Sequence, residues 1–436
     1  MADLNQLFQD YARDPVPADR GVKGWHILVI RLGVALTLPA YLTGGQIGLN
    51  VGLIGGILAA LVAGLVLAAV GVTTGYIGAK TRLSTYMISR YAFGRTGAKL
   101  TNFILALTLF GWFGVTAAFF AQATDTLAAD FFRLEWGVTT WVVIGTVLMI
   151  STALFGIKGL DALSKIVTPL LFALLVAAVI KSLGSTSVAE AVTYDNPQGF
   201  PVGAAVSMLV GGGMVGAVVL PDLTRYALTP KHGMVGGGGS FILGNLVVIV
   251  PCVFLAIANQ QADLVQIVVS FGWAAWALII IFLSAWSTND NNIYSASLGL
   301  ASIFDRVSKW MITMVAGVAG GMLAAVGMFD LLVPFLMGLG ILIPPVAGIF
   351  AADFFLRRKA YMDGGREAMP AFRWQAFVVW SVASGVAYAT QPAEAGGLGA
   401  FYLTRIPALD ALLVSALGYA ALHRLASGME PGLEVT

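Results

Sequence analysis

The sequence predicts an all-α polytopic membrane protein whose core consists of two inverted five-helix repeats. Its 436 residues are 58% hydrophobic and 11% charged, with a mean hydropathy of +0.87. Soluble domains carry roughly 25% charged residues, so this composition indicates a membrane protein. Apolar stretches long enough to cross a bilayer recur along the chain, and a few of them contain clustered polar residues or glycines.

The remaining composition excludes several classes of protein. A net charge of +2, with basic residues dispersed between apolar spans, argues against a nucleic-acid partner. Cys252 is the single cysteine, so no intrachain disulfide forms. Residues 1–24 are polar and lack the basic start and short apolar run of a secretory signal, so we expect a cytoplasmic N-terminal segment and a retained first span.

Twelve membrane spans are expected, although ten or eleven fit the same pattern. A polar linker at 359–372 separates a ten-helix core, 25–358, from residues 373–436, which hold two peripheral helices and a cytoplasmic tail. The third and eighth spans are longer than a bilayer needs, which fits tilt or an interfacial extension. The expected spans are 25–46, 51–74, 98–130, 137–157, 162–183, 202–221, 236–259, 265–303, 310–328, 330–355, 373–391 and 399–424.

The distribution of Lys and Arg predicts the orientation. With the N-terminus inside, the inside segments hold 20 of the 24 basic residues, and the outside segments hold Arg133, Lys181 and Arg405. Positive residues concentrate on the cytoplasmic side, so both termini are predicted to be cytoplasmic in a cell-membrane protein. Arg31 lies within the first span, and we expect its long side chain to snorkel to the inner interface.

Glycine and proline interrupt the first helix of each predicted repeat. The first span contains Pro39, and the sixth contains Gly211–Gly213, Gly216 and Pro221. Such interruptions at corresponding places in two halves indicate discontinuous helices around a midplane binding site in secondary transporters. The alternative is that these glycines only allow helices to pack closely.

Residues 284–292 form the most polar stretch inside a predicted span. Ser284, Ser287 and Thr288 recur at i, i+3 and i+4, so their hydroxyls share one helix face. With carbonyls released by an unwound first helix near Gly33 to Leu36, they would make an oxygen-rich site suited to Na⁺. The alternative is that each hydroxyl bonds back to its own helix.

Asp290 and Asn289 complete this polar stretch. A carboxylate at membrane depth is costly and is usually functional, so Asp290 could hold a proton, a cation or a substrate donor. If the span ends earlier, Asp290 is only an interfacial cap. His26, His232 and His423 all lie at span ends, so we expect no histidine relay or metal cluster, and no resident cofactor.

Trp112 on the third span has Thr108 and Thr116 one turn to either side, which makes an aromatic face between two hydroxyls. That arrangement suits the stacking of a flat heterocycle, although membrane tryptophans more often serve packing. The chain lacks a P-loop, an H-E-x-x-H motif and a G-x-S-x-G motif, which argues against an enzyme and against an ATP-driven pump.

Several stretches resemble the nucleobase:cation symporter-1 family, most closely its cytosine permease-like branch. They run in the family's order across about residues 20 to 358. The stretches are Tyr41–Gly45, Gly75–Thr81, Gly111–Gly114, Asp222–Arg225, Trp286–Asn291, Ile343–Pro345 and Ala352–Asp353.

The resemblance implies a LeuT-like symporter with twelve transmembrane helices. It places the sodium site at the side chains of Ser287 and Thr288 and the main-chain oxygens of Gly33, Leu36 and Ser284. It makes Trp112 the stacking residue. Leu109, Gly212, Gly213, Val215 and Ser284 depart from the cytosine permease pattern, so the resemblance favours a ring other than cytosine.

We therefore expect Trp112, Thr108, Thr116, Gly212, Gly213, Asn289 and Asp290 to bind the cargo. The expected cargo is a nucleobase or related nitrogen heterocycle, imported with a cation, by our prediction Na⁺. One alternative is a proton-coupled carrier of hydantoin, allantoin or hydroxymethylpyrimidine-type compounds that uses Asp290. An uncoupled channel is the alternative from another class, and a membrane enzyme comes third.

Overall fold

The computed structural model describes residues 11, 14–155, 157–196, 199, 201–304, 306–328, 332–362, 369–393 and 397–428. Within these ranges the chain is helical, and its only extended pairing is an isolated bridge between Val22 and Ala227. The all-α prediction is confirmed. Seven of the described helices are long and apolar enough to cross a membrane, and this number does not establish the twelve expected spans.

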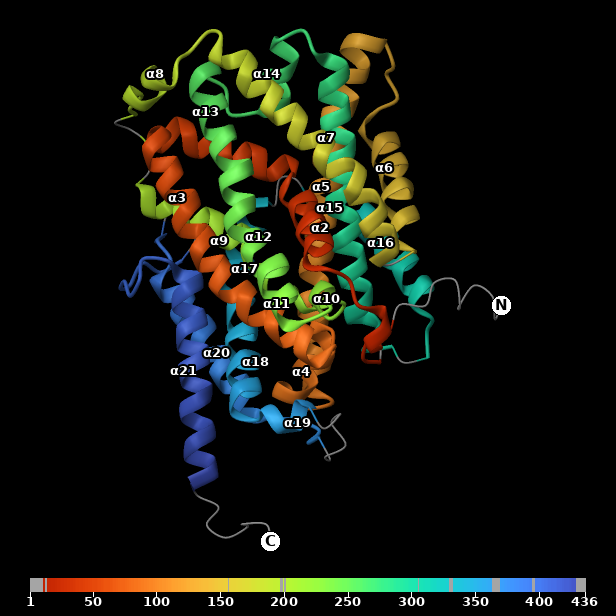
Figure 1. Cartoon of the computed structure of the whole chain (residues 1–436), viewed down its shortest axis with the longest axis vertical. Coiled ribbons are helices and arrows are strands. Elements are labelled where there is room, and N and C mark those ends of the chain that lie inside the picture. The colour runs from red at the N-terminus through yellow and green to blue at the C-terminus, as the bar shows by residue number, and fades with distance from the viewer. Residues whose placement is uncertain are drawn as a thin grey trace.

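The helices follow one another with short connections (Figure 1). In chain order they are η1 (Ala18–Arg20), α2 (Gly24–Ala35), α3 (Leu38–Thr81), α4 (Thr85–Phe93), α5 (Gly97–Phe132), α6 (Val138–Ala153), α7 (Ile157–Leu183), α8 (Val188–Thr193), α9 (Val202–Val218), α10 (Pro221–Thr224), α11 (Pro230–His232), η2 (Gly233–Gly238), α12 (Gly239–Gly244), η3 (Asn245–Ile249), α13 (Val250–Asn259), α14 (Leu264–Ser270), α15 (Ala274–Ala301), α16 (Lys309–Ala325), α17 (Leu332–Leu342), α18 (Pro344–Leu356), α19 (Arg358–Met362), α20 (Trp374–Thr390) and α21 (Pro407–Gly428).

Two boundaries differ from the sequence prediction. The expected span 265–303 is two helices, because Gly272 adopts a φ of +78° and ends α14 before α15 begins. The first two expected spans share α3, which is interrupted at Gly52 with a φ of +70°. Left-handed φ values of this size are open to glycine at little cost, which explains why the chain bends at these two positions.

The sixth span is not broken where we expected. Helix α9 runs continuously from Val202 through Gly211–Gly213 to Val218, and the interruption comes at Val219 and Leu220, just before Pro221. The glycines stay helical, and Gly213 allows close approach of another helix. A Cβ added at Gly213 would lie 2.5 Å from Leu67 Cδ1 on α3, so this glycine lets α9 pack against α3.

Helix α15 occupies the centre of the molecule. It packs against α5, α6, α7 and α16, and every residue from Ser287 to Ala301 is buried. Figure 1 shows α15 running through the half of the molecule that also holds α5, α6, α7 and α16. The polar stretch that stood out in the sequence is therefore enclosed by protein and does not face lipid.

The last two helices, α20 and α21, pack against α18 at the other side (Figure 1). The buried carboxylate of Asp353 on α18 accepts hydrogen bonds from Tyr361 Oη at 2.6 Å and Tyr419 Oη at 2.8 Å. Arg357 Nη1 also donates to it at 2.9 Å. This network fixes α21 to the core.

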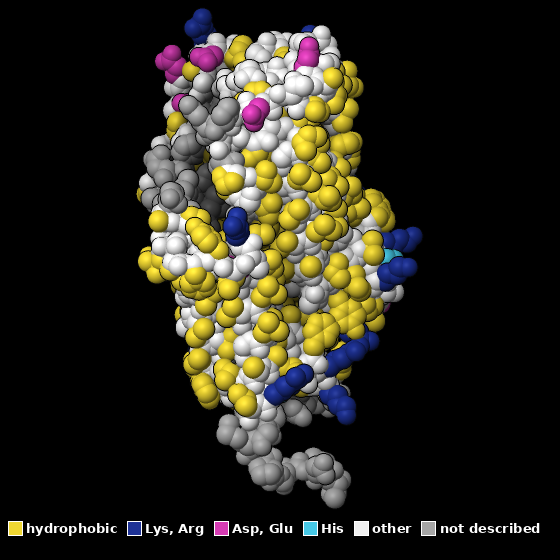
Figure 2. Space-filling model, turned by 90° about the vertical axis from the view of Figure 1, so that its left-hand side faces the viewer, with side chains coloured by type: hydrophobic (Ala, Val, Ile, Leu, Met, Phe, Trp, Pro, Cys, Tyr) yellow, Lys and Arg dark blue, Asp and Glu magenta, His cyan; other side chains and the backbone are white. Residues whose placement is uncertain are grey.

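The outer surface is apolar over most of its height. Figure 2 shows hydrophobic side chains across the middle of one face, with most Lys and Arg side chains toward one end and Asp and Glu toward the other. Large apolar side chains such as Val147, Ile166 and Val326 are 62%, 71% and 78% exposed. A surface of this kind suits lipid, so the chain is a multi-pass membrane protein.

Candidate functional site

The first expected span is broken near its middle. Helix α2 ends at Ala35, Leu36 adopts a non-helical φ/ψ of −80° and 68°, and α3 begins at Leu38. The Thr37 N–H bonds to the carbonyl of Ala35 at 3.0 Å instead of to that of Gly33, which an unbroken helix would require. Thr37 caps α3 by accepting from the Ala40 N–H at 3.2 Å. The predicted discontinuity is present, one turn before Pro39 is reached.

Hydroxyl groups of α15 face this region. Ser284, Ser287 and Thr288 are 0%, 4% and 6% exposed. The hydroxyls of Ser287 and Thr288 make no hydrogen bond to any described residue, and Ser284 Oγ reaches the Ile281 carbonyl only at 3.5 Å. Buried polar groups are nearly always paired, so two orphaned hydroxyls on one face indicate a ligand position.

Gly33 of α2 lies against these hydroxyls. A Cβ added at Gly33 would be 2.9 Å from Ser287 Oγ, 2.7 Å from Thr168 Oγ1 and 3.5 Å from Ser164 Oγ. The hydrogen-only side chain of Gly33 therefore leaves a small space that hydroxyls of two other helices border. The structure brings Gly33 together with Ser287, as the sequence prediction requires.

Sequence reasoning missed the contribution of α7. Ser164 and Thr168, both on this helix, are 3% and 7% exposed. Thr168 Oγ1 donates its proton to the Val29 carbonyl of α2 at 3.1 Å, which leaves the oxygen lone pairs available toward Gly33. Their i, i+4 spacing on an apolar helix was the available signal, but only the fold places α7 beside α2.

The polar atoms that border this space are uncharged hydroxyl and carbonyl oxygens. No group of three His, Cys, Asp or Glu side chains that could hold a metal ion occurs in the described part of the chain. Hydroxyl and carbonyl oxygens suit hard cations, and a site without a carboxylate carries no charge to match a divalent ion. The residues present therefore fit a monovalent hard cation such as Na⁺.

Asn289 projects away from this hydroxyl face, because it lies about 100° around the helix from Thr288 and about 200° from Ser287. Asn289 Nδ2 donates to the Phe113 carbonyl at 3.0 Å and lies 3.1 Å from Met149 Sδ, so it links α15 to α5 and α6. Asn292 Nδ2 donates to Asn289 Oδ1 at 3.1 Å. The amide of Asn289 is thus committed to helix packing in this conformation.

Asp290 is fully buried on the α6 side of α15. Neither carboxylate oxygen makes a hydrogen bond of standard geometry to a described residue, although Thr152 and Lys309 are close enough to interact with it. Trp286 Nε1 donates to the Thr152 hydroxyl at 2.9 Å on the same side. Asp290 follows Ser287 by three residues, so it lies beside the hydroxyl face, on the side toward α6.

Trp112 lies half-buried on α5, edge-on to Phe335 of α17 with ring centroids 5.8 Å apart and an interplanar angle of 76°. Thr108 donates to the Leu105 carbonyl of its own helix at 2.7 Å, whereas the buried Thr116 hydroxyl has no partner among the described residues. One face of α5 thus presents an indole and one free hydroxyl.

Gly212 of α9 borders open space: an added Cβ would meet no heavy atom within 4 Å in the described part of the chain. Gly213, its neighbour, faces Leu67 of α3. Gly212 is thus an exposed position with room for a side chain, while Gly213 in this conformation serves contact between α9 and α3.

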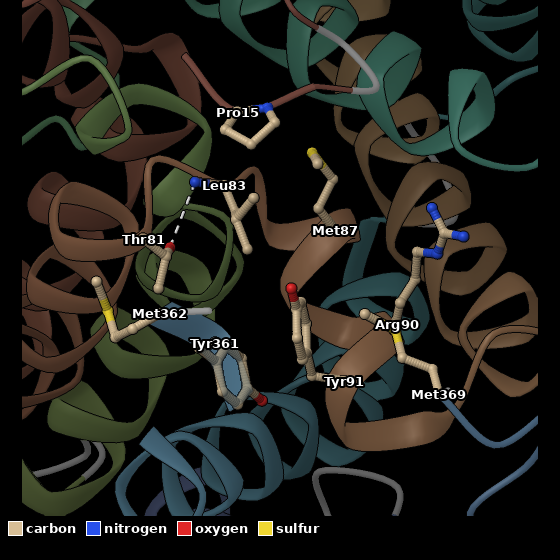
Figure 3. Close-up of a pocket in the computed structure, with 9 residues that line it drawn as sticks. All are labelled: Pro15, Thr81, Leu83, Met87, Arg90, Tyr91, Tyr361, Met362 and Met369. Atoms are coloured by element: carbon tan, nitrogen blue, oxygen red, sulfur yellow. Dashed lines mark hydrogen bonds between the residues drawn. The ribbon is translucent and has the colours of Figure 1, made fainter. Parts of the chain in front are cut away.

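A separate pocket of about 420 Å³ lies where α4 and α19 meet (Figure 3). Tyr91 and Tyr361 stack there with ring centroids 4.2 Å apart, and burial, together with the Asp353 carboxylate, raises the pKa of the Tyr361 hydroxyl well above its usual value. None of the predicted site residues lines this pocket. The residues that line it are Pro15, Thr81, Leu83, Met87, Arg90, Tyr91, Tyr361, Met362 and Met369.

The fold and the broken first helix define a class, the membrane transporters with a LeuT-like fold. The chain is similar to Mhp1, a nucleobase-cation-symport-1 family transporter solved in a closed conformation with bromovinylhydantoin bound. The TM-score is 0.79 and the identity 19%, over 96% of this chain and 95% of that one.

Comparison of sequences identifies the family within that class. Residues 15–389 match the family described as permeases for cytosine/purines, uracil, thiamine and allantoin, and the chain belongs to this family. It is 28% identical to the cytosine permease of Escherichia coli (strain K12) over 419 residues, 95% of this chain and 94% of that protein. It is 25% identical to the hydantoin permease of Microbacterium maritypicum over 431 residues, 90% of this chain and 86% of that protein. The predicted family and fold class are confirmed, and these relatives are permeases, not enzymes.

Proposed function

We propose that this protein imports a nucleobase or related nitrogen heterocycle across the cell membrane together with Na⁺, by alternating access. The observation that carries the proposal is the contact of Gly33, near the broken end of α2, with the orphaned hydroxyl of Ser287, beside which Thr288 carries a second orphaned hydroxyl. Main-chain oxygens of Gly33, Leu36 and Ser284 would complete the cation site. Both termini are cytoplasmic in this proposal, as the 20 basic residues of the inside segments favour.

The cargo would bind between α5 and α9. In this conformation Trp112 offers a stacking face, Thr116 a free hydroxyl and Gly212 open space. Four further residues would contact the cargo only in the outward-open or inward-open forms: Thr108, Gly213, Asn289 and Asp290. Leu109 and Val215 supply no hydrogen bonds for the polar edge of cytosine, and a site without those partners rejects such a ring. Hydantoins and substituted pyrimidines are therefore favoured over cytosine.

Coupling follows from linkage. The cation, bound at Ser287 and Thr288, would stabilise the form that accepts substrate, and each ligand must bind better to the state that the other favours. A proton-coupled carrier is the second candidate, because Asp290 is buried without a well-formed hydrogen bond. Uptake that depends on external Na⁺ would support the Na⁺-coupled carrier. Uptake that depends on pH, with this dependence lost in Asp290→Asn, would support the proton-coupled carrier.

The test is the thermal stability of the purified protein with a panel of purines, pyrimidines and hydantoins, in Na⁺ and in choline. A ligand that binds the folded state raises its apparent stability by mass action. We expect one ring class to stabilise the protein in Na⁺ only, and Thr288→Ala to abolish the dependence on Na⁺. Equal stabilisation in choline would refute sodium coupling.

Thr73→Ala is the matched control. Thr73 is a half-buried threonine of α3 that donates to the Ala69 carbonyl of its own helix at 2.9 Å. Its loss should leave both ring binding and the effect of Na⁺ unchanged. Saturable uptake with counterflow in proteoliposomes excludes the remaining alternative, an uncoupled channel.

A further inference from the structure

Arg31 of α2 is a buried cation in the middle of the first broken helix. Its side chain is only 8% exposed, so it does not snorkel to the interface as the sequence suggested. It precedes Ala35, the last residue of α2, by four residues, which is about 6 Å along the helix. A guanidinium at this depth is costly unless something of opposite charge or polarity meets it.

No such partner is present in the described part of the chain. Arg31 Nε is buried without a hydrogen bond, and none of the ion pairs formed by described residues includes Arg31. Its guanidinium lies over the Phe241 ring of α12, 4.7 Å from the centroid. This contact covers one face of the guanidinium plane and leaves its N–H edge available.

Two other buried or half-buried arginines of the same protein are satisfied. Arg225 is fully buried, and it donates to the Asp222 carbonyl at 3.1 Å, the Tyr11 carbonyl at 2.7 Å and Tyr294 Oη at 3.0 Å. Arg357 pairs with Asp353 at 2.9 Å. The lack of a partner is therefore a property of the Arg31 site and not a general feature of the fold.

The guanidinium edge of Arg31 faces α9. A Cβ added at Gly216 would lie 3.0 Å from Nη2 and 3.2 Å from Nη1, so only glycine leaves room for the charge here. Gly212 precedes Gly216 by one helical turn on the same face of α9, and it borders the open space described above. Arg31 thus lies one helical turn along α9 from Gly212, a residue of the proposed cargo site.

We propose that Arg31 is the counter-charge for the cargo, and that the cargo is a heterocycle that carries a negative charge at neutral pH. The planar guanidinium binds two neighbouring acceptor atoms in parallel, which suits a ring-borne carboxylate or a deprotonated ring nitrogen beside a carbonyl. This proposal rests on the proposed function and specifies its substrate class. With one Na⁺, such a cargo would cross the membrane without net charge.

The test compares matched rings by their ability to stabilise the purified full-length protein in Na⁺. Orotate and uracil differ by a ring carboxylate, and urate and xanthine differ by the ease of ring deprotonation. We expect orotate or urate to stabilise the wild-type protein at a concentration at least tenfold lower than its neutral counterpart. Which pair shows the preference distinguishes a carboxylate from a ring anion.

Three variants assign that preference to Arg31. Arg31→Gln should abolish it, and Arg31→Lys should retain part of it, because the charge remains while the two-pronged geometry is lost. Arg31→Met should abolish it too, and should leave the protein without ligand at least as stable as wild type, since an unpaired buried charge is removed. A purely structural role for Arg31 predicts the opposite, a loss of stability with ring preference intact.

Three outcomes would overturn the proposal. A preference for the neutral ring of each pair, unchanged in Arg31→Gln, would refute it while leaving a heterocycle transporter in place. Stabilisation by chloride or phosphate alone, lost in Arg31→Gln, would make Arg31 a site for a free anion. Stabilisation by none of these rings and none of the neutral panel would refute the proposed function as well.

Discussion

Replacement of Gly33 by alanine is the sharpest test of the proposed cation site. The added methyl would lie 2.7 Å from Thr168 Oγ1 and 2.9 Å from Ser287 Oγ, both closer than ordinary van der Waals contact. Overpacking of this kind costs about 1–3 kcal/mol. The methyl would also fill the space that the hydroxyls border. An ion could enter only if the methyl or a hydroxyl moved further, at a cost of the same order.

The expected result is a weaker response to Na⁺. A cost of about 1–3 kcal/mol corresponds to a roughly 5- to 150-fold higher Na⁺ concentration for half-maximal stabilisation. The assay is a Na⁺ titration of thermal stability at constant ionic strength, with choline as the replacement ion. An unchanged Na⁺ midpoint in Gly33→Ala would refute the assignment of the ion to this space.

Gly385→Ala provides the control for the substitution itself. Gly385 lies in α20, and an added Cβ there would meet no heavy atom within 4 Å among the described residues. Alanine should be neutral or stabilising by up to about 1 kcal/mol, with an unchanged Na⁺ midpoint. Thr168→Val, which keeps the volume and removes one hydroxyl, should raise the midpoint without the steric clash.

Three further predictions concern other parts of the molecule. Trp112→Ala should raise the ring concentration for half-maximal stabilisation about tenfold, since stacking on an aromatic contributes about 1–3 kcal/mol, whereas Trp374→Ala, at a residue 59% exposed, should not. Asp353→Asn should lower unfolding stability by about 3 kcal/mol, because Arg357 loses its buried partner; an unchanged denaturation midpoint would contradict this. Burial raises the pKa of Asp263, the N-cap of α14, so the folded protein holds the proton of this carboxyl more tightly than the unfolded chain does. The stability that this carboxyl contributes is therefore present at low pH and is lost as pH rises through its folded-state pKa. Asp263→Asn should flatten the stability profile over that range, and a profile identical to wild type would show that the carboxyl is not responsible.

The sequence by itself determined the class of protein and pointed to most of the residues of the proposed cation site. The thickness and apolarity of the bilayer set the length and composition of each span, so each span can be predicted from its own stretch of sequence. The i, i+3, i+4 spacing of Ser284, Ser287 and Thr288 fixes a common face on any helix, and Pro39 marks the nearby break. These features depend only on neighbours along the chain.

The tertiary structure decided which side chains meet. The sequence could not place α7 beside α2, and so it missed Ser164 and Thr168. It also could not assign Asn289 and Asp290 to the α5 and α6 side of α15, because helical spacing gives relative directions but not the neighbours they face. Arg31 is the clearest case: its burial and its lack of a partner arise from α9 and α12, segments that lie about two hundred residues away in the chain and reach it only through folding.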